Sequence, residues 1–209
     1  MKNKKLFLSA LIIFGISVMG CSTTIAWNKV DLDLGGPPHS QIHNLRNETS
    51  GIEIGLRRQI EDIMKIFLDD HGEEFGFYTV DFTTEIVDYN LVLPFVSGLT
   101  VFSLNILGMP WTTVTYRLHA FLNIFDSQGN HVQSFENSNS FSFAQGFYYN
   151  YKPPTRKVGR IYSELFEDLL RQTDINARLI NAVLENAGPI TAENLASARA
   201  RIRRSERPR

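Results

Sequence analysis

The chain has 209 residues, of which 43% are hydrophobic and 21% are charged, and its formal net charge is −1 at pH 7. The hydrophobic share is too high for a wholly disordered chain, and the near-zero charge argues against a general nucleic-acid binder. One cysteine excludes an internal disulfide framework and a cysteine-based zinc cluster, and the length fits one domain.

The N-terminus has the pattern of a secretory signal. Three lysines, Lys2, Lys4 and Lys5, precede an uncharged apolar run of 13 residues from Leu6 to Val18. The run is too short to span a bilayer, but it suits the apolar part of a signal peptide. It leads into Val18-Met19-Gly20-Cys21, with an aliphatic residue three positions before the cysteine and a small residue just before it.

This ending resembles the lipobox of bacterial lipoproteins. The resemblance implies cleavage before Cys21 and acylation of Cys21 with lipid, including a fatty acid such as palmitate. Stable anchoring takes more than one acyl chain, which is what that family attaches. Because Ser22 and not Asp follows the cysteine, the resemblance implies the outer membrane, facing the periplasm. An uncleaved N-terminal membrane helix with an incidental cysteine remains the alternative.

Cleavage would change the charge. The mature chain, residues 21–209, would lose three lysines and carry 18 basic and 22 acidic residues, a net charge of −4. Residues 31–100 hold 13 acidic and 4 basic side chains, whereas residues 151–209 hold 12 basic and 7 acidic ones. The near-neutral total therefore hides an acidic front and a basic tail.

Hydrophobic spacing predicts the elements in chain order. Residues 24–34 alternate as a strand, and Ser50 and Glu53 form a capping-box pattern before a helix at about 52–71. Strands follow at 77–89, 112–126 and 131–143. The last two form a hairpin through a turn at Asp126–Asn130. Helices are predicted at 156–172, 175–187 and 192–204, the last capped by Thr191.

Strands grouped before helices predict an α+β fold. We expect an antiparallel sheet of about four or five strands, with an N-terminal crossover helix and C-terminal helices packed on one face. The predicted organisation is a signal peptide at 1–20, a single lipid-anchored domain at 21–188, and a basic helix or tail at 189–209.

The middle of the chain carries no charge for 28 residues, from Tyr89 to Tyr116. Within it, residues 91–111 favour a buried strand and turn. Two alternatives remain open: a loop or hairpin that touches a bilayer or a partner, and a true membrane span, against which Pro94, Gly98 and Pro110 argue. Because the predicted first strand begins a few residues after Cys21, we expect part of 91–111 to lie on the same side as the anchor.

Six residues are the candidates for membrane or partner contact: Leu107, Met109, Trp111, Phe147, Tyr148 and Tyr149. Aromatic side chains of this kind give a large contact area at a low entropy cost. Several segments are also similar to a loose pattern among small bacterial envelope lipoproteins of unassigned function: 97–100, 108–110, 126–129 and 147–149. That resemblance supports the topology and supplies no active site.

Four arginines near the C-terminus are candidates for anion binding: Arg199, Arg201, Arg203 and Arg204. They could form a solvated helix end, bind anionic lipid or another polyanion, or contact an acidic protein. His39 and His43 are spaced as metal ligands can be, but a loop role is favoured because no third ligand is evident.

The sequence contains no nucleophile-elbow or nucleotide-binding signature, so no catalytic residue, cofactor or metal is predicted. The favoured hypothesis is a non-enzymatic, lipid-anchored envelope protein, acting as an assembly, transport-accessory or binding module. Its partners would be membrane lipid through Cys21 and another envelope protein or anionic lipid. The alternatives are an envelope hydrolase acting on peptidoglycan or lipid, and an oligomeric lipoprotein that inserts residues 91–111 into the membrane.

Overall fold

A computed structural model describes residues 41–52, 54–69, 72–99, 103–146 and 155–205. The predicted signal peptide and strand, at 1–20 and 24–34, lie outside the described residues, as do Cys21 and His39. So do Phe147, Tyr148 and Tyr149.

The sheet has four strands in the order β1-β2-β3-β4: β1 (Leu45–Asn47), β2 (Gly76–Tyr89), β3 (Thr112–Asp126) and β4 (His131–Gln145). β2, β3 and β4 are antiparallel neighbours, whereas β1 runs parallel to β2. A parallel pair needs a crossover, and α2 (Ile54–Phe67) provides it. The predicted α+β class and crossover helix are thus confirmed, with a sheet that is mixed because of β1.

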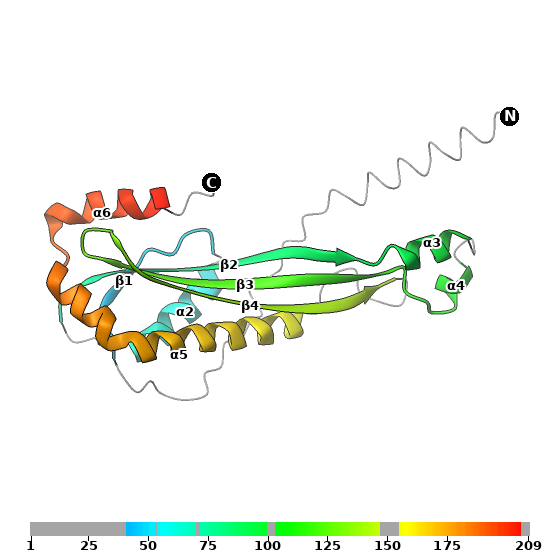
Figure 1. Cartoon of the computed structure of the whole chain (residues 1–209), viewed down its shortest axis with the longest axis horizontal. Coiled ribbons are helices and arrows are strands. Elements are labelled where there is room, and N and C mark those ends of the chain that lie inside the picture. Colours follow the sequence, from blue (N-terminus) through cyan, green and yellow to red (C-terminus); the bar gives the residue numbers. More distant parts are fainter. Residues whose placement is uncertain (1–40, 53, 70–71, 100–102, 147–154, 206–209) are drawn as a thin grey trace, which may run out of the picture.

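The three long strands extend well beyond the helices and form an arm. β2, β3 and β4 have 14, 15 and 15 residues and pair along nearly their whole length. Figure 1 shows that the helices α2, α5 and α6 gather at one end, which we call the base. The other end of the arm carries two short helices, α3 (Val92–Leu99) and α4 (Ser103–Ile106).

The main core lies between one face of the sheet and two helices, α2 and α5 (Thr155–Ala187). Alternation along β3 puts Val114, Leu118 and Leu122 on this face, where all three are buried. The apolar stripe of α2, with Leu56 and Ile60 fully buried, completes the core. The stripe is the one that the spacing predicts.

α5 is one continuous helix of 33 residues, and the prediction of two helices at 156–172 and 175–187 was wrong. The residues between the two predicted helices include neither Gly nor Pro, so nothing stops the helix there. Thr173 is buried, and its hydroxyl donates to the Leu169 carbonyl 2.7 Å away within the same helix. A polar residue that could have ended the helix is therefore satisfied inside it.

α6 (Ala192–Ser205) packs on the other face of the sheet, which differs from the single covered face that we expected. Ala198 and Ile202 of α6 contact Phe77 and Phe125, whose side chains alternate away from the main core. Thr191 caps α6 as predicted, because its hydroxyl accepts from the Asn194 N–H at 3.4 Å.

Candidate functional site

Residues 91–111 do not form the buried strand that the sequence favoured. The β2–β3 pairing ends at Tyr89 and Val114, and the Asn90 N–H donates to the Thr113 carbonyl just past it. The apolar run therefore continues beyond the last rung of the sheet, where it forms α3 and α4. Among the described residues, no helix has both the length and the apolar character needed to cross a membrane.

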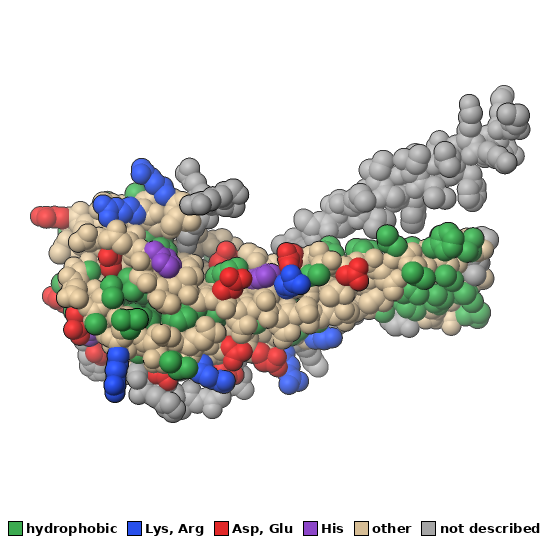
Figure 2. All heavy atoms as spheres, viewed as in Figure 1, with side chains coloured by type: hydrophobic (Ala, Val, Ile, Leu, Met, Phe, Trp, Pro, Cys, Tyr) green, Lys and Arg blue, Asp and Glu red, His purple; other side chains and the backbone are tan. Residues whose placement is uncertain are grey.

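The two helices at the end of the arm expose an apolar surface, which we call the apolar tip. It consists of six large side chains that are each more than 60% exposed: Leu91, Val92, Phe95, Leu99, Ile106 and Leu107. Figure 2 shows these hydrophobic side chains gathered over α3 and α4. Soluble proteins rarely leave so many large apolar residues together in water, so a patch of this kind marks a contact surface.

Local sequence explains why α3 forms and which side chains it exposes. The Asn90 side chain caps the helix, since its Oδ1 accepts from the Val92 N–H at 3.0 Å. Pro94 falls in the first turn, where a missing N–H costs no helical hydrogen bond. Val92, Phe95 and Leu99 follow the i, i+3, i+7 spacing of a helical stripe.

Hydrogen bonds hold the backbone around α4 together. Asn105 is fully buried and donates from Nδ2 to the Met109 carbonyl at 3.0 Å. The Met109 N–H donates to the Leu104 carbonyl at 3.0 Å, and the Gly108 N–H donates to the Asn105 carbonyl at 3.2 Å. The tip is thus a built structure with internally bonded backbone groups, and most of the side chains that it exposes are apolar.

The predicted contact residues differ in how far they are exposed to solvent. Leu107 is 82% exposed at the apolar tip, whereas Met109 and Trp111 are partly buried beneath it. The backbone N–H of Trp111 donates to the Gln145 carbonyl at 2.6 Å, so Trp111 joins the tip to the end of β4. The prediction missed five tip residues, Leu91, Val92, Phe95, Leu99 and Ile106. For Val92, Phe95 and Leu99, helical spacing after a capping asparagine was the signal available.

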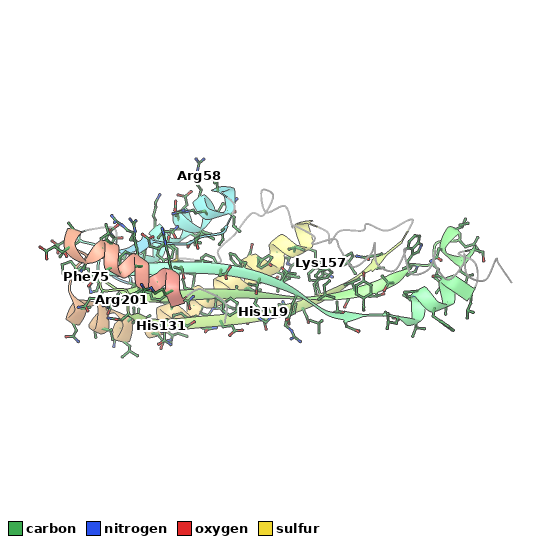
Figure 3. All side chains as sticks on the ribbon, turned by 90° about the horizontal axis from the view of Figure 1, so that it is seen from above. Arg58, Phe75, His119, His131, Lys157 and Arg201 are labelled. Carbon is green, nitrogen blue, oxygen red and sulfur yellow. The ribbon has the colours of Figure 1, made fainter. Side chains whose placement is uncertain are left out.

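Aromatic side chains line the arm next to the tip. Tyr116 stacks with Phe141 and Phe143, at centroid distances of 5.9 and 5.6 Å. The Lys157 ammonium, at the start of α5, lies 5.3 Å from the Phe141 centroid, beside the arm in Figure 3. Tyr89 lies where the arm meets the tip, a place that we call the neck. Its partial burial and, to a smaller extent, the charge of Tyr116 raise the pKa of the Tyr89 phenol, so this phenol stays neutral.

The predicted anion-binding arginines lie at the base, far from the tip. Arg199 donates from Nε to Glu48 Oε1 at 2.6 Å, and Arg201 donates to the Gln128 carbonyl at 3.3 Å, beside the β3–β4 turn. Arg203 and Arg204 are exposed. Arg199 and Arg203 also line a cavity of about 200 Å³, together with Arg57, Thr49 and Ser50.

Two histidines, His43 and His119, have local partners. His43 Nε2 lies 2.9 Å from Glu185 Oε1, and its ring contacts the Phe75 ring at a centroid distance of 4.8 Å, tilted by 30°. His119 and Arg117, on the face of β3 away from the main core, both approach Glu85, at 3.4 and 3.0 Å. These contacts tie neighbouring strands or elements together. In the described part of the chain, His, Cys, Asp and Glu form no group of three that could hold a metal ion.

Comparison with known proteins gives little. No protein-family model matches the chain, and no curated protein matches it. Among solved structures, the chain is similar to a minor lipoprotein from Acinetobacter baumannii, with 14% sequence identity and a TM-score of 0.37. The match covers 69% of this chain and 94% of that one. A likeness of this size carries no argument about what this chain does.

Proposed function

We propose that this chain is a non-enzymatic, lipid-anchored protein of the bacterial envelope. It would sit on the outer membrane, facing the periplasm, and act as an assembly, transport-accessory or binding module. The Val18-Met19-Gly20-Cys21 sequence supports the anchor, and the absence of a catalytic signature in the sequence supports a binding role. In this proposal the arm carries the working contact surface away from the base.

The exposed apolar tip is the observation that carries the proposal. Burying a Leu or Phe side chain contributes about 1.5–3 kcal/mol, so six exposed large side chains forgo a large stabilisation in the isolated chain. None of the six belongs to the main core, which lies between the sheet and the helices α2 and α5. A contact outside the molecule would recover this free energy.

A crosslinking experiment in intact cells tests the contact. A photoactivatable residue at Leu107 is expected to capture a lipid or protein adduct. The matched control is Ile175, an equally apolar side chain that is exposed on α5 at the base. Adducts that are the same from both positions, or none from Leu107, would contradict a contact at the tip. Cys21→Ala tests the anchor separately, since it should release the protein from the membrane fraction.

A second candidate function, anion binding, is favoured by the cavity at the base. Its lining includes three arginines, Arg57, Arg199 and Arg203, together with Thr49, Ser50 and the acidic Glu48. Glu48 neutralises Arg199, and Glu61 pairs with Arg57 at 3.1 Å, so Arg203 is the cation to change. Arg203→Ala should weaken the binding of inorganic phosphate measured by calorimetry, whereas Arg160→Ala, on α5, should not. Equal binding by both variants would exclude this site.

A further inference from the structure

The apolar tip is exposed in the isolated chain. We infer that the lipid bilayer that holds Cys21 covers this tip, so that the protein is attached to the bilayer at two points; this inference rests on the proposed function. One point is the acylated cysteine and the other is α3 with α4. The inference stands on three observations: the reach of the chain before Gln41, the chemistry of the tip, and the length of its helices.

The chain before Gln41 is long enough to place both attachments on one membrane. Ile42 pairs with Leu68 just after α2, so the described chain begins at the base. From Cys21 to Gln41 the chain advances 20 residues, which span at most about 70 Å. β2 has 14 residues, or about 45 Å, and the eight residues of α3 add about 12 Å. The chain from Cys21 to Gln41 is therefore long enough to reach past the tip.

The surface of the tip matches a bilayer better than it matches a protein groove. Protein interfaces carry about one hydrogen bond per 100–200 Å². α3 and α4 contain three polar side chains, and two of them, Ser97 and Asn105, are buried. The charged residues that flank the tip in sequence, Asp88 and Arg117, lie back along the arm. Contact with a bilayer requires neither hydrogen bonds nor a complementary shape.

Two further features fit the boundary between lipid and water. Backbone groups must be bonded internally where water is absent, and those around Asn105 are. Tyr89, which is 37% exposed, lies between the apolar tip and the charged arm, at the level where amphipathic rings collect in membrane proteins. α3, about 12 Å long, is much shorter than a hydrocarbon core of about 30 Å, so the tip would enter one leaflet only.

The experiment uses the full acylated chain and a single labelled thiol. Because Cys21 is the only cysteine and acylation blocks it, Leu107→Cys carries one free thiol for an environment-sensitive fluorophore. Ile175→Cys is the matched control on α5. Each labelled protein is bound to vesicles of phosphatidylethanolamine and phosphatidylglycerol and recovered by flotation. Quenching of the fluorophore is then measured with iodide in the water and with spin-labelled lipid in the bilayer.

We expect the probe at position 107 to shift its emission to the blue, to lose most of its quenching by iodide and to be quenched by spin-labelled lipid. The probe at position 175 should keep its iodide quenching. A position 107 probe that stays open to iodide on floated protein would overturn the inference, as would one shielded from iodide but untouched by spin-labelled lipid. Neither result would harm the proposed anchor, which fails instead if the wild-type chain labels with the thiol reagent.

Discussion

The hydroxyl oxygens of Thr84 on β2 and Tyr162 on α5 lie 2.8 Å apart. The Tyr162 ring is fully buried and meets the edge of Phe82 at a centroid distance of 4.9 Å. This contact lies where the arm leaves the helices of the base. It therefore fixes the direction in which the arm, and with it the apolar tip, projects from the core.

Tyr162→Phe removes this hydrogen bond and keeps the ring. Because Thr84 is exposed and can bond to water instead, the free energy of unfolding should fall by only about 1 kcal/mol. Urea denaturation followed by circular dichroism measures the change. Tyr89→Phe, which alters a partly exposed phenol, is the control and should leave the free energy unchanged. A loss that is equal in the two variants would contradict a role for the Thr84 contact.

The same tyrosine makes stability depend on alkaline pH. Burial, opposed by the Thr84 hydrogen bond and reinforced by the charge of Asp81, raises the pKa of Tyr162 from 10.0 to about 12. The unfolded chain therefore loses this proton at lower pH than the folded chain, so stability is lost as pH rises from about 10 to about 12. The expected loss is about 2–3 kcal/mol. Burial also raises the pKa of Tyr78, which adds to it.

Unfolding measured across this range should show a smaller loss for Tyr162→Phe than for the wild-type chain, because the variant has no proton to release at that position. Below about pH 9 the two curves should run parallel, since the phenol is then protonated in both states. Curves that remain parallel up to pH 12 would show that the tyrosine does not titrate with a raised pKa.

Gly129 controls the docking of α6. Its backbone has a φ of +78°, and a Cβ placed there would lie 2.6 Å from the Ala198 carbonyl oxygen. Gly129→Ala should therefore cost about 1–3 kcal/mol and speed amide hydrogen exchange in α6. Gly98→Ala, in α3, meets nothing within 4 Å and should be neutral or stabilising. Protection of α6 that is unchanged by Gly129→Ala would refute the close approach.

The apolar tip should be dispensable for folding. Leu107→Asp places a charge on a side chain that is already in water, so the free energy of unfolding should change by no more than about 0.5 kcal/mol. Leu118→Ala, in the main core, should cost about 2–5 kcal/mol. Thermal and urea unfolding compare the two variants. A large loss from Leu107→Asp would mean that the tip packs within the molecule.

Local chemistry was enough to predict the hairpin. Residues 112–126 alternate so regularly that both ends of β3 were predicted correctly. The turn is set by one side chain, because Asp126 Oδ1 accepts from the backbone N–H groups of Gln128 and Asn130, each at 2.8 Å. Such contacts lie within a few residues of each other, so a sequence pattern carries them.

The apolar tip could not be predicted in the same way. An uncharged run is equally compatible with a buried strand and with an exposed contact surface, because only the position of the run relative to the core separates the two. Here the decision falls at Asn90, where the hydrogen bond to Thr113 closes the ladder and the side chains of Val92, Phe95 and Leu99 that follow stay exposed. The side of the sheet that α6 covers depends in the same way on Phe77 and Phe125, which lie far from it in sequence.

The sequence by itself determined the β3–β4 hairpin and the apolar stripe of α2, because each follows from periodicity and turn or cap residues in one continuous segment, and the order of these elements determined the α+β class. The tertiary structure alone decided that α3 and α4 stand at the end of a long arm, and that Arg57, Arg199 and Arg203 line one cavity. The contact between Arg199 and Glu48 beside that cavity joins residues 151 positions apart, and the free energy that selects it comes from packing the whole chain.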